Sequence, residues 1–500
     1  MRASLIGLLI LGSCRPAHAP SKPPPVVHAT SVTDGPSTSM GQPSGRPTVV
    51  SDGPMLPTRE PKLGLVPTTE DFAPALRTAA EKLSVAAQTR RRGYERLVAL
   101  ADKFGHRLSG SLALERAIDW SLERMREDKL VNVRREKVMV PRWVRGAEKA
   151  RISSPIQREL VVLGLGGTVG TRGTLRGEIA VVDSLADIAV KGAALRGKIV
   201  VINQPMPAFD HEHHVTGYGE TVKIRVSGAS EAAKVGAKAV LIRSVTASSL
   251  RTPHTGSMKY TEGVGKIPAA AVTLEDAELL ARLAAQGKTT VELSLGARTL
   301  PDSESGNAIA EIRGRELPDE VVVIGGHLDS WDVGDGSSDD GAGCVMAMDA
   351  AAMLVELGLI PRRTIRVVLF TNEENGLRGG RAYHAAHAKE KHAAAIESDS
   401  GAGPPRGFGV GGTPEQAAAI QRFGPLFAQL GADKLSVGGG GSDIEPLAQD
   451  GVITVGLHPD TSLYFDLHHS PADTIDKIDP ANVARNTAAM ALMAYILAER

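Results

Sequence analysis

The chain is poor in cysteine and in aromatic residues. Its 500 residues include two cysteines, Cys14 and Cys344, and aromatic side chains make up 3% of the total. This count excludes a small scaffold held by several disulfides, so packing has to supply most of the stability. Cys344 stands in an apolar segment, where it is most simply a small buried side chain.

The chain also lacks an excess of charge of either sign. It has 57 basic and 57 acidic residues, and it contains no polybasic block. Such a balance argues against a nucleic-acid partner. Hydrophobic residues make up 42% of the chain, which is enough for one large core and a smaller second domain.

No apolar run is long enough to cross a membrane, but a short one stands near the N-terminus. Met1 and Arg2 precede the apolar residues 5–11, a pattern typical of an export signal. Residues 11–14, Leu-Gly-Ser-Cys, resemble a bacterial lipobox, which predicts a signal peptide over 1–14 and lipidation of Cys14. Cleavage after Ala19 is the alternative, although it would place Pro20 at the new terminus. The protein is therefore expected to be exported, either anchored to a bacterial membrane through Cys14 or secreted.

Residues 15–70 are rich in Pro, Ser, Thr and Gly and contain few large apolar side chains. A segment of this composition cannot build a core and is predicted to be a disordered linker.

The informative part of the chain is a repeated local pattern in which an apolar run ends in acidic or imidazole residues. The runs 321–324, 365–370 and 393–396 lead to His327, to Glu373 and Glu374, and to Asp399. Short apolar runs that alternate with helical stretches such as 343–357 predict an α/β fold with a mixed, largely parallel sheet flanked by helices. In such sheets, residues at the carboxyl ends of strands converge on one site.

These residues have the chemistry of metal ligands. Imidazole and carboxylate suit zinc, and a small ligand set can hold two ions if one carboxylate bridges them. Asp339, in a glycine-rich turn, is the predicted bridge. Of the neighbours Glu373 and Glu374, which should point in opposite directions on an extended segment, one binds metal and the other acts as general base. Asp329 is predicted to orient the ring of His327 through its carboxylate.

The set of motifs resembles the co-catalytic zinc aminopeptidase and glutamate carboxypeptidase superfamily, and within it the plasma glutamate carboxypeptidase (carboxypeptidase Q) branch. The matching segments are 94–97, 107–111, 253–256, 326–334, 339–341, 373–374, 397–399, 440–444, 468–470 and 473–474. They occur in family order from roughly residue 75 to the C-terminus, which makes a chance match very improbable.

The resemblance implies a role for each residue of the site. It assigns His327 and Asp399 to one zinc, Glu374 and His469 to the other, Asp339 to both, and Glu373 to the general base. It also implies a cis peptide between Asp339 and Asp340 and a homodimer. His469 is chosen over His468 because it stands four residues before Asp473, as in the matching motif. The residue that stabilises the oxyanion is not supplied by the resemblance.

The resemblance further divides the chain into domains. Residues 71–172 and 298–500 are expected to form the zinc-exopeptidase catalytic domain, interrupted by an inserted protease-associated α/β domain over 173–297. Strands are predicted at 178–182, 198–202 and 239–242, and helices at 79–104, 111–129 and 274–286. Asp479 and Pro480 predict the start of a last helix that runs almost to Arg500.

Several further motifs have weaker claims. The cluster His211, Glu212, His213 and His214 lacks helical ligand spacing and reads as a solvated loop. The stretch 329–340 has Trp331 in place of a calcium ligand, 164–170 lacks the helix of a dinucleotide loop, and 438–441 lacks the ending of a phosphate loop.

The sequence thus predicts an exported di-zinc exopeptidase that hydrolyses short peptides or dipeptides. An aminopeptidase with the same two zinc ions is the alternative, because nothing in the motifs shows which end of the peptide is recognised. The complete ligand set disfavours a receptor-like module without activity, and the insertion disfavours a glutaminyl-cyclase-like transferase.

Overall fold

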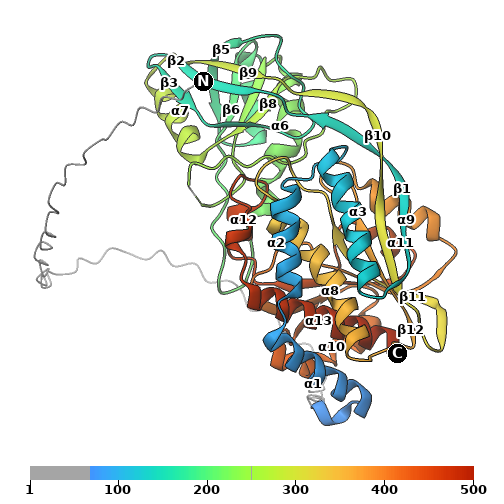
Figure 1. Cartoon of the computed structure of the whole chain (residues 1–500). Helices are drawn as coiled ribbons and strands as arrows, with labels where there is room; N and C mark the ends of the chain where they lie inside the picture. The colour runs from blue at the N-terminus through green and yellow to red at the C-terminus, as the bar shows by residue number, and fades with distance from the viewer. Residues whose placement is uncertain (1–67, 249) are drawn as a thin grey trace, which may run out of the picture. The chain divides into compact units, whose positions relative to one another are not determined.

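A computed structural model describes residues 68–248 and 250–500 (Figure 1). The predicted signal peptide, Cys14 and nearly all of the predicted linker lie outside the described residues. The described residues belong to one compact unit, and the account below concerns that unit. Among its described helices, none combines the length and the apolar character that a membrane span requires.

The first of two sheets has eight strands in the order β1-β10-β12-β11-β13-β16-β14-β15. These are β1 (Val131–Val144), β10 (Arg298–Ile312), β11 (Leu317–His327), β12 (Arg363–Phe370), β13 (Lys391–Glu397), β14 (Pro405–Val410), β15 (Lys434–Val437) and β16 (Ile453–Pro459). The four central strands β12, β11, β13 and β16 run parallel to one another, whereas the pairs β1/β10, β10/β12 and β14/β16 are antiparallel. The predicted α/β class with a mixed, largely parallel central sheet is confirmed.

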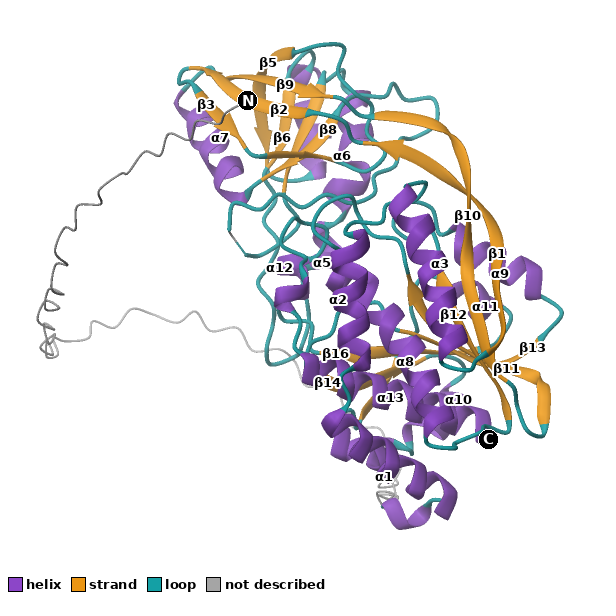
Figure 2. Cartoon of the chain, viewed as in Figure 1, coloured by secondary structure: helices purple, strands orange, loops and turns teal. Residues whose placement is uncertain are grey.

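Helices cover both faces of this sheet (Figure 2). Alternate strand residues point to opposite faces: Val322 and Ile324 join the large core under α8 and α13, while Val321 and Val323 join a smaller core under α9 and α11. The helices of this part are α1 (Pro74–Thr89), α2 (Arg92–Phe104), α3 (Leu112–Glu127), α8 (Ala342–Glu356), α9 (Arg378–His387), α10 (Pro414–Gln421), α11 (Glu445–Gln449), α12 (Tyr464–Leu467) and α13 (Pro480–Glu499).

Two helix boundaries show how local and distant contacts compete. The last helix starts as predicted, with the Asp479 side chain accepting the N–H of Ala481 and proline in the first turn. The single helix predicted over 79–104 is instead α1 and α2, separated at Arg90, which has an extended backbone. Arg90 donates through Nε and Nη2 to Asp349 at 2.8 and 2.5 Å, and this ion pair holds the break.

The second sheet also has eight strands, in the order β3-β2-β9-β5-β6-β7-β8-β4. Its elements are β2 (Glu148–Ser154), β3 (Arg158–Leu160), β4 (Val162–Gly164), β5 (Leu175–Val182), α4 (Leu185–Lys191), β6 (Ile199–Ile202), α5 (Tyr218–Thr221), α6 (Lys223–Lys234), β7 (Ala239–Arg243), β8 (Ala269–Val272), α7 (Leu274–Gln286) and β9 (Thr290–Leu295). The predicted strands at 178–182, 198–202 and 239–242 and the predicted helix at 274–286 are present.

This second sheet begins before the predicted boundary at residue 173. Strand β2 pairs antiparallel with β9, and β4 pairs with β8, so residues 148–164 share a sheet with strands that lie within the predicted insertion 173–297. These strands are short and partly polar, and their sequence gives little sign of the partner far along the chain. The long pair β1/β10, from Val131↔Glu311 to Val144↔Arg298, connects the two sheets.

Candidate metal centre

The predicted ligands meet at the carboxyl ends of the central parallel strands. His327 is the last residue of β11, Glu373 and Glu374 follow β12, and Asp399 follows β13. Strands β12, β11 and β13 are adjacent and parallel, so their ends lie at the same edge of the sheet. His469 reaches this edge from the loop after α12.

Asp339 lies between two sets of donors. Its Oδ1 is 3.3 Å from His327 Nε2, which is also 3.4 Å from Asp399 Oδ1. Its Oδ2 is 3.1 Å from His469 Nε2, which is also 3.0 Å from Glu374 Oε2. Each carboxylate oxygen of Asp339 therefore faces a different imidazole, the arrangement that a bridging ligand needs.

The donor set fits a cation. Asp339 Oδ2 and Glu374 Oε1 are buried and have no hydrogen-bond partner. A buried carboxylate oxygen without a donor is costly, and a bound cation removes that cost. The mixture of imidazole nitrogen and carboxylate oxygen is the one that zinc prefers.

Without a bound cation, the surroundings of Glu374 and His469 raise the pKa of both side chains. Burial raises the pKa of Glu374 to about 7, and the carboxylate of Asp339 acts in the same direction. Burial lowers the pKa of His469, but Glu374 and Asp339 outweigh it and raise the value to about 9. Metal ligands of these types must lose their protons to bind, so acid should weaken the binding of metal.

Two neighbouring side chains were not among the predicted ligands. His468 stacks on His469, with ring centroids 3.5 Å apart, and its Nε2 is 3.6 Å from Asp339 Oδ2. His469 makes the closer contacts and reaches two carboxylates. Asp340 also lies beside His327, but its oxygens accept the backbone N–H groups of His327 and Gly343 at 3.1 and 3.0 Å. The peptide between Asp339 and Asp340 is cis, as the resemblance implied.

Glu373 lies in a tight turn rather than on the extended segment expected from the sequence. Residues 373–376 form the turn, and Asn372 before it has a left-handed backbone with φ 66°. Burial raises the pKa of Glu373 well above its usual range, while His327 opposes this shift. A raised pKa brings a carboxyl group closer to the pH at which an enzyme works, which suits general acid and base chemistry.

The predicted contact of Asp329 is wrong in one respect. His327 Nδ1 is 2.9 Å from the backbone oxygen of Asp329, whereas the Asp329 carboxylate is 3.9 Å away. The carboxylate accepts instead the backbone N–H of Glu373 at 3.0 Å and the hydroxyl of Ser109 at 3.1 Å. Imidazole needs only one acceptor for its second nitrogen, and the carbonyl lies closer. Asp329 thus orients His327 through its backbone and Glu373 through its side chain.

Asp473 has a positioning role that its place in a motif did not reveal. Its Oδ1 accepts the N–H of Ser338 at 2.7 Å, and its Oδ2 accepts the N–H of Asp339 at 3.1 Å. A single buried carboxylate therefore fixes the backbone of the residue between the two donor sets. The Asp-Thr motif was a signal for this residue, but the two acceptors become visible only in the fold.

A cavity of about 580 Å³ opens onto the centre. One wall comes from the segment that carries the second sheet, with Tyr218, Arg225 and Lys259. That segment also contacts the loop that carries His469. Arg225 Nη1 is 3.2 Å from His469 Nδ1, and the Thr255 N–H donates to the His469 carbonyl oxygen at 2.9 Å. These contacts link residues far apart in the chain, and no local sequence pattern predicts them.

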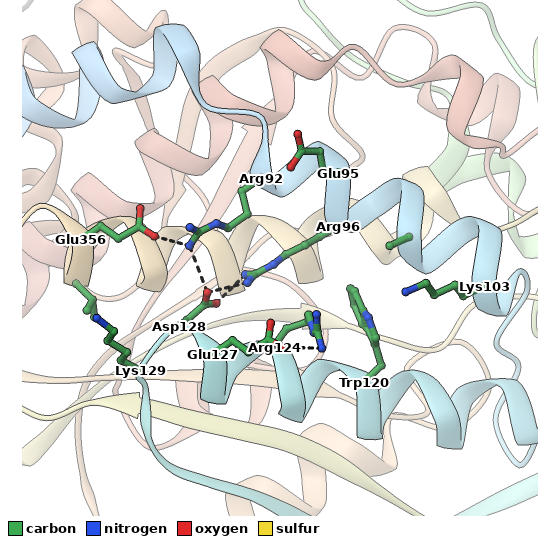
Figure 3. Close-up of a pocket in the computed structure, with 12 residues that line it drawn as sticks. Arg92, Glu95, Arg96, Lys103, Trp120, Arg124, Glu127, Asp128, Lys129 and Glu356 are labelled. Atoms are coloured by element: carbon green, nitrogen blue, oxygen red, sulfur yellow. Dashed lines mark hydrogen bonds and ion pairs between the residues drawn. The ribbon is translucent and has the colours of Figure 1, made fainter.

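A larger cavity, of about 780 Å³, lies apart from these ligands (Figure 3). It is lined by α2, α3 and the end of α8, and its charges largely pair with one another. Arg96 donates to both oxygens of Asp128 at 2.7 Å, and Arg92 lies 3.3 Å from the same carboxylate.

The His211–His214 cluster is exposed, and His213 Nδ1 contacts Asp210 at 2.8 Å. Neither place gathers metal ligands among the described residues.

Comparison with known proteins finds a peptidase family whose members are similar to this chain. The profile of Peptidase family M28 matches residues 307–494. Carboxypeptidase Q of Mus musculus is 42% identical over 434 residues, which cover 86% of this chain and 90% of the relative. Carboxypeptidase Q of Homo sapiens is 40% identical over 421 residues, covering 83% and 87% of the two chains.

Solved structures give the same picture. A peptidase M28 precursor from Shewanella amazonensis SB2B is 38% identical, with a TM-score of 0.81 over 85% of this chain and 97% of that one. The zinc aminopeptidase BSAP from Bacillus subtilis shares the fold, with 22% identity and a TM-score of 0.61 over 82% and 95% of the two chains.

Proposed function

Because the chain belongs to Peptidase family M28, we propose that it is a di-zinc exopeptidase that hydrolyses short peptides or dipeptides. Its place among zinc metallopeptidases follows from the family, whereas the number of zinc ions and the roles of single residues are the proposal. The observation that carries it is the position of Asp339, whose two oxygens face two separate pairs of donors.

We assign His327 and Asp399 to one ion, His469 and Glu374 to the other, and Asp339 to both. Two zinc ions held there would polarise the scissile carbonyl and lower the pKa of an attacking water. Glu373 lies in the same cavity and is the side chain left to move the proton. It accepts the proton of the attacking water and returns it to the amine that leaves.

The test is the substitution Glu373→Gln, which keeps the size of the side chain and removes its base. The variant should lose turnover of a dipeptide by about a hundredfold or more, while mass spectrometry of the metal still finds two zinc ions per chain. Glu262→Gln, at an exposed position, serves as the matched control. Unchanged turnover in Glu373→Gln would remove Glu373 from the mechanism.

An aminopeptidase is the second candidate function, supported by the shared fold of BSAP. The two functions differ in the end of the peptide that the enzyme recognises. A panel of dipeptides with either the amino or the carboxyl terminus blocked separates them, since only the blocked end that matters reduces turnover. The complete donor set argues against a receptor-like module, and a zinc count of two would argue against a single-zinc cyclase.

The remaining assignments stay proposals with tests of their own. Export and lipidation of Cys14 predict incorporation of labelled palmitate that a Cys14→Ala variant loses. A homodimer predicts twice the chain mass in light scattering. We propose that the segment of the second sheet is the protease-associated domain and that it shapes the substrate cavity.

A further inference from the structure

The motif at residues 107–111 lies between α2 and α3 and supplies none of the proposed ligands. Its first residue, Arg107, is fully buried, with 0% of its surface exposed. A buried guanidinium has lost its hydration, so its five N–H groups need acceptors inside the protein. The acceptors of Arg107 therefore show what its side chain holds in place.

The Arg107 side chain donates only to backbone carbonyl oxygens. Its Nε donates to Leu328 at 2.8 Å, and its Nη2 donates to Gly336 at 2.9 Å. Its Nη1 donates to Asp335 at 2.6 Å and to Gly105 at 2.8 Å. None of these acceptors is a carboxylate, so the guanidinium acts as a fork of donors rather than as one half of an ion pair.

Three of these carbonyl groups belong to the two ends of one loop. Residues 328–336 contain no helix or strand; the loop begins directly after His327 and ends directly before the turn 337–341, which carries Asp339. The donors of a planar guanidinium have fixed positions, so this side chain can hold both ends of the loop at a set separation. That separation bears on the contact between His327 Nε2 and Asp339 Oδ1, which are 3.3 Å apart.

Arg107 is itself held in place by the same loop. Its backbone N–H donates to Ser330 Oγ at 3.0 Å, and the Ser330 N–H donates to the Arg107 carbonyl oxygen at 3.2 Å. The space beside the guanidinium is filled, because a Cβ added to Gly336 would lie 3.0 Å from Arg107 Nη2 and 2.4 Å from Ser330 Cβ. The side chain is therefore a fixed support for the loop.

We propose that Arg107 is a positioning residue of the metal centre. Its guanidinium fixes the two ends of the loop 328–336 and thereby the separation of His327 and Asp339 at the ion that they share with Asp399. The proposal rests on the proposed function and adds a residue that touches neither metal nor substrate. The role is geometric, since the charge alone would act in the opposite direction: a buried cation near the centre repels zinc.

Two substitutions separate the shape of the side chain from its charge. Arg107→Lys keeps the charge but gathers the donors at one point, which cannot reach both ends of the loop. Arg107→Met removes the charge and the donors together. Both variants should bind zinc about 10–100-fold more weakly than wild type in titrations against a fluorescent chelator. If charge decided the affinity, Arg107→Met would bind zinc more tightly and Arg107→Lys would match wild type, which would overturn the proposal.

Cobalt in place of zinc gives a readout of geometry, because the visible absorption of Co²⁺ depends on the arrangement of its ligands. The spectrum of the Co²⁺ form of Arg107→Lys should differ from that of wild type in band position or intensity. Arg96→Lys is the matched control: Arg96 is also buried and donates to both oxygens of Asp128 at 2.7 Å, but it lines the cavity apart from the ligands (Figure 3). This control should lose stability and keep the zinc affinity and the Co²⁺ spectrum of wild type. The same losses in Arg96→Lys would assign the effect to general destabilisation and overturn the proposal.

Ser330→Ala keeps the test decisive if the Arg107 variants fail to fold. It removes the acceptor of the Arg107 N–H and should weaken zinc binding by about two- to tenfold. Wild-type zinc affinity and an unchanged Co²⁺ spectrum in the folded variants would overturn the proposal. A wild-type chain that binds fewer than two zinc ions refutes the proposed di-zinc centre, whereas a di-zinc wild type whose affinity these substitutions leave unchanged refutes the role of Arg107 alone.

Discussion

Replacing Asp473 by asparagine tests how the bridging position is built. Asp473 is 3% exposed, and its two oxygens accept the N–H groups of Ser338 and Asp339 at 2.7 and 3.1 Å. Asparagine keeps one acceptor and turns an NH₂ group toward the other N–H. One buried backbone donor is then unsatisfied, which should lower the free energy of unfolding by about 1–3 kcal/mol.

The same substitution should also weaken zinc binding. Asp339 would lose one of the contacts that fix its backbone, and loss of such a supporting contact typically reduces metal affinity by about 10–100-fold. Competition with a chromogenic chelator measures the affinity, and urea unfolding of the metal-free protein measures the stability. Asp476→Asn is the control, since Asp476 is close in sequence but exposed. An Asp473→Asn protein with wild-type zinc affinity would refute the reasoning.

Two further predictions concern packing and pH. In Gly166→Ala the new Cβ would lie 1.8 Å from Cη2 of Trp331, so urea unfolding should show a loss of about 1–3 kcal/mol, whereas Gly219→Ala, which meets no atom within 4 Å, should show little change. His387 lies between two carboxylates, at 2.8 and 2.9 Å from its ring nitrogens. Burial lowers its pKa, but the carboxylates outweigh this and raise it above 6.5. The difference in the free energy of unfolding between the wild type and His387→Gln should have its full value below about pH 6.5 and should disappear as pH rises through the raised pKa. A difference that stays constant from about pH 5.5 to 9 would contradict this prediction.

The strands that carry the centre could be predicted because their signal is local. Each is a short apolar run that ends at a polar residue, and parallel strands bring such ends together whatever their order in the sheet. The split between α1 and α2 could not be predicted in the same way. Its cause is the ion pair of Arg90 with Asp349, which is 259 positions away in the chain.

Within the site, the contacts of single residues could not be predicted from the sequence either. Residue type indicated that Asp329 supports the centre, but the choice between its carbonyl and its carboxylate depends on backbone torsions that a motif does not encode. For Arg225, even the residue type gave no indication of a contact with the site. Nothing within α6 marks this arginine, and its contact with His469 spans 244 positions.

The segment of the second sheet does more than cover the centre, because it also supports the loop that carries His469, one of the proposed ligands. His469 has a left-handed backbone with φ 58°, a conformation that costs a residue other than glycine about 1–3 kcal/mol. Three contacts from that segment hold the loop in place: the Thr255 N–H donates to the His469 carbonyl oxygen, Arg225 lies against the ring, and His254 Nδ1 is 2.7 Å from the His468 carbonyl oxygen. A strained ligand persists only where its surroundings fix it. The first sheet therefore carries the proposed strand-end ligands, whereas the contacts that support His469 come from the segment of the second sheet, so we expect the proposed centre to need both parts.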